Sequence, residues 1–336
     1  MNDDTPYLED GFSSLTPDVL LNAVEKEVGE RLTGLTSPLP SYINRVYELL
    51  AFSGKRYVVK FYRPGRWKKE AIEDEHRFMM DCVENDIPVV PPLSLSNGHT
   101  LGNVGGIYFA VFEKRSGREM ELNTDDDWKR VGTLLGRVHM TGSSGASPHR
   151  VHLHPEKSLR TDIEWLLSGN DIPPHMVKDV KTVLESVHST ASQAFAAVAD
   201  ADIIRLHGDC HLKNFLSRDQ EGLLIIDFDD MATGPAVQDI WLLLPDRVDN
   251  CRKEFNLLLS GYEQFRDFDD RTLWLVEPLR AMRMIYFLAW CSRQKKDYRF
   301  KTLFPDWGSE NFWRSEMNDL TRQLNHMQTE KPKGNW

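Results

Sequence analysis

Residues 205–230, RLHGDCHLKNFLSRDQEGLLIIDFDD, gather two histidines, one cysteine, one asparagine and five aspartates within a short stretch. His207, Cys210 and His211 superficially have the spacing of zinc ligands, but no second Cys/His pair follows at the distance of a structural zinc site. The alternating aspartates and terminal glutamate of a calcium-binding loop are also missing here. Acid–base chemistry is another use that the aspartates and the asparagine could have.

Phosphoryl transfer needs such a set of groups. An aspartate must accept or orient the proton of the attacking hydroxyl, and oxygen ligands must hold Mg²⁺ on the nucleotide phosphates. Asn214 follows Asp209 by five residues, which is the spacing of the base and the metal-binding amide in a kinase catalytic loop. Asp227 directly follows the apolar run LLII, and a buried strand there would aim its carboxylate. The segment predicts Asp209 as the base and Mg²⁺ ligands at Asn214 and Asp227.

The chain upstream should then supply a lysine for the phosphates. Residues 44–52 (NRVYELLAF) and 55–63 (KRYVVKFYR) are rich in strand-forming side chains and meet at a turn-like Ser-Gly-Lys, so they predict a hairpin. Lys60 ends the stretch YVVK in the second strand, in the manner of the V-A-I-K strand of kinases.

A helix carrying a glutamate should follow that strand. Residues 67–86 have an amphipathic helical pattern that must end before Pro88. Glu75 shares the apolar face of this helix and is expected to point toward the sheet and pair with Lys60. Glu73 and Asp74 are the alternatives for this role.

The rest of the chain predicts an α+β fold of two lobes. Residues 99–114 have the pattern of another strand pair, whereas helical patterns begin near Thr124 and dominate residues 161–200 and 237–336. We expect an N-terminal antiparallel sheet with one main helix, followed by a mostly helical C-terminal lobe. The predicted domains are residues 1–114, which would bind nucleotide, and residues 115–336, which would hold the catalytic and substrate groups. The terminal segments 1–12 and 329–336 are the expected disordered parts.

These motifs resemble known proteins at two levels, a broad group and a narrower family. HGDCHLKN followed by IIDFDD resembles the HGDxHxxN…IDxxD signature of the aminoglycoside phosphotransferase and choline kinase group, a branch of the protein-kinase-like fold. More narrowly, SYINRVYEL, VVKFYRPGRW, GPAVQDIWLLL and EPLRAMRMIYFLAW resemble the stress response kinase A family of bacteria. Members of that family are Mg²⁺- and ATP-dependent serine/threonine protein kinases. The resemblance extends from about Pro17 to Trp313.

The resemblance implies roles for individual residues. It repeats the assignment of Asp209, Asn214 and Asp227, and it places Lys60 against phosphate and in a pair with Glu75. Further contacts to ATP would come from Ser41 over the phosphates and from a hinge around Glu113 against adenine. SYINRV contains no GxGxxG, so a glycine-rich phosphate loop is not predicted.

Other polar residues are expected to have structural roles. His207 should link the catalytic loop to the strand before Asp227, and Asp239 should tether that loop through backbone hydrogen bonds. We expect His139 to be a hydrogen-bonded helix histidine and Cys210 to be an inert packed thiol, while His211 either packs or orders the site. Asp229 and Asp230 are expected to cap a turn, with assistance to the metal as the alternative.

Composition limits the classes of partner. The net charge of −10 argues against a nucleic-acid or anionic-membrane binder, and no apolar run is long enough to span a bilayer. Four cysteines without CxxC spacing and an N-terminus without signal-peptide features are typical of a cytoplasmic protein. The expected partners are ATP and a protein with a Ser/Thr acceptor, and the expected state is a monomer. A small-molecule alcohol kinase and a nucleotide-binding pseudokinase remain alternatives.

Overall fold

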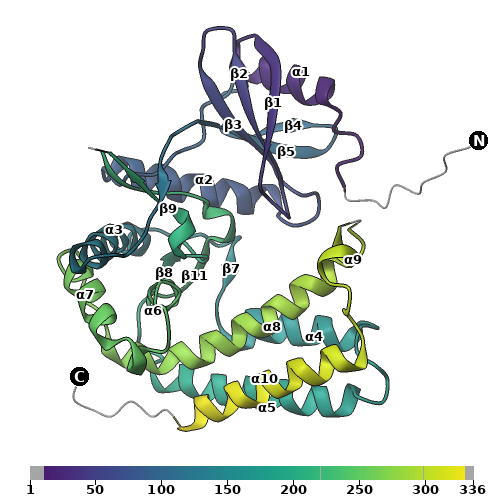
Figure 1. The fold of residues 1–336 in the computed structure, drawn as a ribbon, viewed down its shortest axis with the longest axis vertical. Helices are drawn as coiled ribbons and strands as arrows, with labels where there is room; N and C mark the ends of the chain where they lie inside the picture. Colours follow the sequence, from purple (N-terminus) through teal and green to yellow (C-terminus); the bar gives the residue numbers. More distant parts are fainter. Residues whose placement is uncertain (1–10, 220, 298, 330–336) are drawn as a thin grey trace, which may run out of the picture.

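A computed structural model describes residues 11–219, 221–297 and 299–329, and its first part is a five-stranded antiparallel sheet (Figure 1). The order of the strands is β1-β2-β3-β5-β4, so β3 lies in the middle of the sheet. The strands are β1 (Leu32–Leu39), β2 (Arg45–Ala51), β3 (Arg56–Phe61), β4 (Gly102–Val104) and β5 (Ile107–Glu113).

The predicted hairpin is confirmed as β2 and β3. Gly54 turns the chain with a φ of +90°, a conformation that glycine adopts without steric cost. In the register of the sheet Lys60 lies between Val46 of β2 and Ala110 of β5. A lysine at the centre of a sheet has little freedom of backbone position, so the point from which its side chain extends is fixed.

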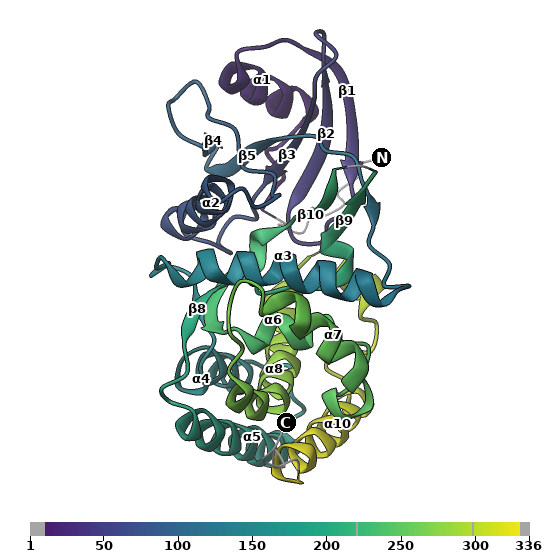
Figure 2. The same cartoon turned by 90° about the vertical axis from the view of Figure 1, so that its left-hand side faces the viewer.

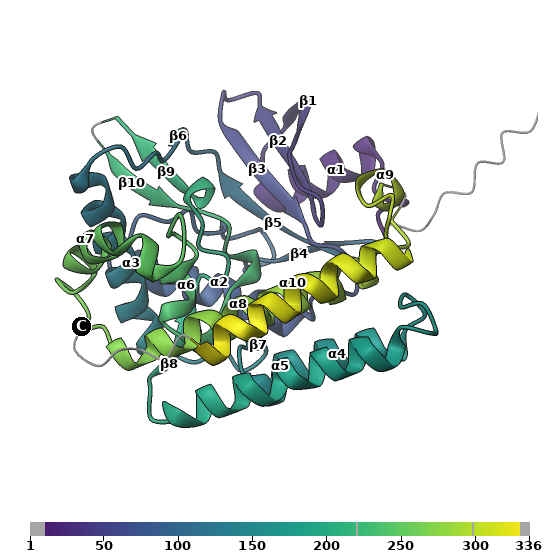
Figure 3. The ribbon, with the colours of Figure 1, turned by 60° about the horizontal axis from the view of Figure 1, so that its bottom comes forward.

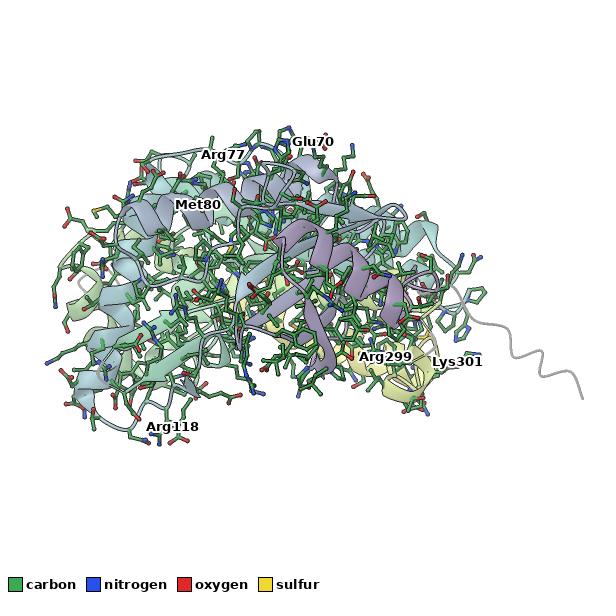
Figure 4. All side chains as sticks on the ribbon, turned by 90° about the horizontal axis from the view of Figure 1, so that it is seen from above. Glu70, Arg77, Met80, Arg118, Arg299 and Lys301 are labelled. Atoms are coloured by element: carbon green, nitrogen blue, oxygen red, sulfur yellow. The ribbon has the colours of Figure 1, made fainter. Side chains whose placement is uncertain are left out.

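Two helices accompany this sheet, and the sequence interpretation included only one of them. The expected helix is α2 (Lys69–Glu84), whose exposed face carries Glu70, Arg77 and Met80 (Figure 4). The second is α1 (Pro17–Val28), which was missed together with β1. Signals for α1 were present, because Thr16 caps its first turn and Gly29 ends it with a φ of +68°.

The second part begins with two small sheets that hold the polar segment identified in the sequence. One has the order β10-β9-β6 and the other β7-β11-β8. The strands are β6 (Arg118–Glu119), β7 (Val151–His152), β8 (Ile203–Leu206), β9 (Phe215–Arg218), β10 (Gly222–Ile225) and β11 (Ala232–Pro235).

Helices make up the remainder, as predicted. Figure 2 shows α3 crossing between the N-terminal sheet and the helical part, and Figure 3 shows α8 and α10 running alongside each other above α4 and α5. The helices are α3 (Asp125–Ser143), α4 (Arg160–Ser168), α5 (Val177–Ala197), α6 (Val237–Trp241), α7 (Arg252–Tyr262), α8 (Val276–Gln294), α9 (Phe300–Leu303) and α10 (Glu310–Thr329).

One hydrophobic cluster joins the two parts. Phe78 and Cys82 of α2 pack with Val131 and Leu135 of α3 and with Phe228, which follows Asp227. All five side chains are almost fully buried. The helix that carries Glu75 is therefore anchored on the same core as the loop that carries Asp227, although the predicted domain boundary at residue 114 separates them in sequence.

Most of the two segments that were expected to be disordered lies outside the described residues. Where the structure does describe the N-terminal one, Phe12 is buried against the sheet. No helix within the described ranges has the length and apolarity to span a membrane.

Candidate active site

The predicted catalytic loop leaves β8 through a turn that only glycine can make. Gly208 has a φ of +85°, and a Cβ atom there would lie 2.0 Å from the carbonyl oxygen of Asp230. The carboxylate of Asp239 accepts hydrogen bonds from the backbone N–H groups of His207 (2.7 Å) and Gly208 (2.9 Å). The predicted tethering role of Asp239 is thus confirmed, and the loop is fixed just before Asp209.

The same loop holds the backbone that precedes Asp227. Ile226 donates its N–H to the carbonyl of Asn214 (2.9 Å), and its own carbonyl accepts from Nε2 of His207 (2.8 Å). Asp227 adopts a left-handed conformation with a φ of +63°, which is costly for a residue other than glycine. The hydrogen bonds on both sides of Ile226 hold Asp227 in that conformation and confirm the linking role predicted for His207.

Asp209 and Asn214 are brought together by a turn of the loop. Nδ2 of Asn214 donates to the backbone carbonyl of Asp209 (2.9 Å), and the N–H of Asn214 donates to the carbonyl of His211. Asn214 is nearly buried, and because its amide nitrogen is engaged, its side-chain oxygen is the group left to act as a ligand.

The carboxylate of Asp209 is held from two sides. Arg283 of α8 donates to its Oδ1 at 2.6 Å, and Nε2 of His211 lies 3.3 Å from its Oδ2. Burial raises the pKa of Asp209, but the hydrogen bond from His211 and the charge of Arg283 outweigh it and bring the pKa below its usual range. Asp209 is therefore an anion at neutral pH, as a proton acceptor must be. Between the two roles left open for His211, ordering the site is the one that the structure supports.

Lys60 lies among three carboxylates. Its Nζ is 2.9 Å from Asp229, 3.4 Å from Asp227 and 3.6 Å from Glu75. Burial lowers the pKa of Lys60, but Asp229 and Glu75 outweigh that effect, so the pKa lies well above its usual value and the ammonium stays charged. Burial raises the pKa of Glu75, a shift that the charge of Lys60 opposes. The predicted Lys60–Glu75 pair is present, and the alternatives Glu73 and Asp74 pair instead with Lys69 and Arg77.

The expectation that Asp229 and Asp230 cap a turn is wrong. Asp229 pairs with Lys60 and with Arg66 (2.8 Å), and Asp230 pairs with Arg66 (2.6 Å). Neither carboxylate caps the short turn Phe228–Asp230. Both carboxylates form ion pairs instead, because folding brings Arg66 close to them. The sequence interpretation did not single out Arg66.

Arg150 is a second arginine that the sequence interpretation did not identify. Arg150 is almost fully buried, and it donates to the backbone carbonyls of Met231 (2.8 Å) and Asp229. Its guanidinium also lies 3.7 Å from Glu75 and over the ring of Trp67, with 4.1 Å to the ring centroid. Nothing in the local sequence around Arg150 distinguishes it from a surface arginine.

The two remaining predicted ATP contacts lie where strands of the N-terminal sheet end. Ser41 is in the β1–β2 loop, where its hydroxyl accepts from the N–H of Asn44 at 3.3 Å. That loop is held by Arg63, which donates to the carbonyl of Ile43 (2.9 Å) and pairs with Asp297 of the helical part (2.6 Å). Glu113 ends β5, and its exposed carboxylate pairs with Arg115. The nucleotide contacts of Ser41 and Glu113 stay predictions.

The structural roles expected for other polar residues are confirmed. His139 is fully buried between the hydroxyl of Tyr262 and the carboxylate of Asp239, both at 3.0 Å. Burial raises the pKa of the Cys210 thiol well above its usual value, as expected for inert packing. Thr124 and Asp127 form a reciprocal cap at the start of α3.

A cleft of about 1720 Å³ opens beside Asp209. Its wall includes a stripe of α8 that carries Arg283, Tyr286, Phe287 and Trp290. Eight arginine and lysine side chains line the cleft against four aspartates, although the whole chain has a net charge of −10. Because Asp209 lines this cleft whereas Lys60, Asn214 and Asp227 do not, the cleft lies on the acceptor side of the predicted chemistry.

The donor set at the predicted metal site fits Mg²⁺. Within the described ranges no three His, Cys, Asp or Glu side chains group closely enough to enclose a metal ion. Magnesium does not need such a group, because it commonly binds through one or two protein oxygens together with substrate phosphates. The side-chain oxygen of Asn214 and the half-exposed carboxylate of Asp227 supply hard oxygens of that kind.

Comparison with known proteins agrees with this geometry. Residues 36–274 match the family described as "Phosphotransferase enzyme family". The chain belongs to that family. The phosphotransferase is also 37% identical over 323 residues to stress response kinase A of Shigella flexneri, covering 94% of this chain and 95% of the relative. It is 36% identical over 318 residues to the serine/threonine protein kinase RdoA of Salmonella typhimurium, covering 93% of each chain. The resemblance to the stress response kinase A family is confirmed.

Solved structures confirm the fold of the phosphotransferase. An amicoumacin kinase in complex with AMP-PNP, Ca²⁺ and amicoumacin has a TM-score of 0.71 at 19% identity, covering 94% of each chain. A microcompartment-associated aminopropanol kinase has a TM-score of 0.67 at 17% identity, covering 93% of this chain and 97% of the other. The α+β fold with its N-terminal antiparallel sheet and helical C-terminal part is the one predicted from the sequence.

Proposed function

We propose that this phosphotransferase is an ATP- and Mg²⁺-dependent serine/threonine protein kinase. The observation that carries the proposal is the connection of four functional residues from separate parts of the chain. Lys60 contacts Asp227, the residue before Asp227 is bonded to Asn214, and Asn214 is bonded to Asp209. A protein that only binds nucleotide would have no chemical need for a catalytic base held in this arrangement.

Each residue has a role in the proposed reaction. Asp209 orients the acceptor hydroxyl and takes its proton, and Lys60 neutralises charge on the phosphates. Asn214 and Asp227 would hold Mg²⁺, which supplies charge neutralisation on the phosphate oxygens when it is bound. Ser41 would donate to the phosphates, and the backbone around Glu113 would contact adenine. Residues 1–114 would form the nucleotide-binding lobe and residues 115–336 the catalytic lobe.

The lining of the cleft favours a protein acceptor over a small cationic alcohol. A cationic acceptor needs free acidic groups, whereas each of the four aspartates that line this cleft is already paired with an arginine. Its volume of about 1720 Å³ also exceeds the roughly 300–1,000 Å³ of ordinary small-molecule sites. Both features suit a peptide segment that carries a serine or threonine, in agreement with the name of the Salmonella relative.

Transfer of label from γ-labelled ATP tests the proposal. The chain with Mg²⁺ would be offered a generic protein substrate and, separately, a panel of small alcohols that includes choline and aminoglycosides. We expect label on serine or threonine, and we expect Asp209→Ala to lower the rate by about 10²–10⁴-fold. Asp249, which is exposed and paired with Arg252, offers a matched control because Asp249→Ala leaves the cleft untouched.

Other outcomes would replace the proposal with its alternatives. Label on a small alcohol alone would make the chain a small-molecule kinase with the same active site. Bound ATP without transfer to either class would favour a pseudokinase. Asp227→Ala should in addition weaken the binding of Mg·ATP, and equal affinity in this variant would remove Asp227 from the metal site.

We further propose that the enzyme acts as a monomer in the cytoplasm, and light scattering of the purified chain would measure its mass.

A further inference from the structure

Helix α8 presents one arginine directly to the proposed base. Leu279, Arg283, Tyr286 and Trp290 recur at helical spacing along the cleft wall, and from this stripe Arg283 contacts Asp209 and Tyr286 contacts Asp230. Arg283 reaches the Oδ1 atom of Asp209 at 2.6 Å across 74 positions of sequence. The contact therefore joins the catalytic loop to the wall of the cleft that α8 forms.

Arg283 differs from the arginines that hold the fold together. Arg205 is 2% exposed and donates to Asp81 and to the backbone carbonyls of Thr141 and Gly142. Arg283 has a side chain 38% exposed, and across residues 11–219, 221–297 and 299–329 Asp209 is its sole hydrogen-bond partner. A partly exposed pair of this kind contributes little to stability. Stability therefore does not account for the position of Arg283 beside the catalytic loop.

We propose that Arg283 is a positioning residue for Asp209, an inference that rests on the proposed function of Asp209 as base. A carboxylate rotates easily about its last side-chain bond, because that torsion has broad minima. Arg283 donates to Oδ1 at 2.6 Å, whereas the contact of His211 with Oδ2 is longer, at 3.3 Å. Arg283 is thus the stronger of the two contacts that fix the plane of the carboxylate, and with it the direction in which the acceptor hydroxyl is held.

The first test measures the kinetics of Arg283→Ala. Misplacement of a catalytic group by an ångström can lower turnover by about 10²-fold, and we expect a loss of that order in kcat. The KM for ATP should stay within about twofold of the parent, because Arg283 is not among the groups proposed to contact nucleotide. Arg314→Ala is the matched control, since Arg314 is also a helical arginine with one carboxylate partner, Glu310, but lies on α10. Wild-type kcat in Arg283→Ala would overturn the proposal.

A double-mutant cycle distinguishes positioning from a merely structural role. If Arg283 acts through the carboxylate of Asp209, then Arg283→Ala should cost no more than about twofold in an Asp209→Asn background. An equal loss in both backgrounds would mean that Arg283 acts on the substrate or on the fold instead, and it would overturn the proposal. Arg283→Lys should recover part of the loss, and guanidinium ion added below denaturing concentrations should partly restore Arg283→Ala.

The same cycle separates failure of this inference from failure of the proposed function. Full activity in Asp209→Asn alone would reject Asp209 as the base, and with it everything that rests on that assignment. An inactive Asp209→Asn together with a fully active Arg283→Ala would leave the proposed function standing and reject only the role of Arg283.

Discussion

Removal of the Asp239 carboxylate should damage both the stability of the fold and the catalytic loop. Asp239 is fully buried and accepts from the N–H groups of His207 and Gly208 and from the ring of His139. Asp239→Ala leaves all three groups buried without this acceptor. Each unsatisfied donor costs about 1–3 kcal/mol, so the two backbone groups alone predict a loss of about 4 kcal/mol in the free energy of unfolding.

That loss in the free energy of unfolding corresponds to a decrease in melting temperature. An unfolding entropy of about 2.1 cal/mol/K per residue over 336 residues makes 4 kcal/mol equivalent to about 6 °C. Turnover should fall by about 10²-fold or more, because Asp209 directly follows His207 and Gly208, whose N–H groups lose their acceptor. Asp239→Asn keeps one accepting oxygen and should lie between the parent and Asp239→Ala in both measurements.

Thermal unfolding followed by circular dichroism, together with label transfer from γ-labelled ATP, would measure the two effects. Asp249→Ala removes an exposed carboxylate from the same part of the chain and should change the free energy of unfolding by no more than about 0.5 kcal/mol. If Asp239→Ala melts within about 1 °C of the parent, two buried backbone donors do not depend on this carboxylate and the reasoning fails.

Three other perturbations test the packing and charges around the site. Lys60→Met should cost about 3–5 kcal/mol in urea unfolding, because it leaves Asp229 and Glu75 buried without their shared cation; a change below about 1 kcal/mol would contradict this. Gly132→Ala would place a Cβ atom 1.9 Å from the carbonyl oxygen of Leu258, so α3 and α7 must separate at a cost of about 3 kcal/mol; an unchanged urea midpoint would show that the helices adjust freely. Burial lowers the pKa of His76 to about 3, below its unfolded value. The unfolded chain therefore binds the proton first as the pH falls, and stability is lost below pH 6.5, by about 2 kcal/mol between pH 7 and pH 5. In His76→Gln this pH-dependent loss should be smaller by that amount, and an equal loss in the variant would assign it to other groups.

The local sequence was sufficient to predict those elements whose signals lie within a few residues. The hairpin around Gly54, the helix that carries Glu75 and the catalytic loop from Asp209 to Asn214 could all be predicted, because turn residues, helical periodicity and motif spacing are local properties. Helix α1 could have been predicted in the same way from Thr16 and Gly29. Its omission was an error of interpretation and not a limit of the sequence.

Long-range contacts decided the rest, because a charged side chain is assigned its partner only when distant elements meet. Asp229 and Asp230 have the local composition of turn caps, but Arg66 comes within 2.8 Å of both and makes them ion-pair partners. Arg283 lies 74 positions after Asp209 in a helix that otherwise reads as core. The sequence by itself determined which residues could perform phosphoryl transfer, since that depends on residue type and spacing. Only the tertiary structure decided which cations hold the carboxylates in place, since that depends on which surfaces the folded chain brings together.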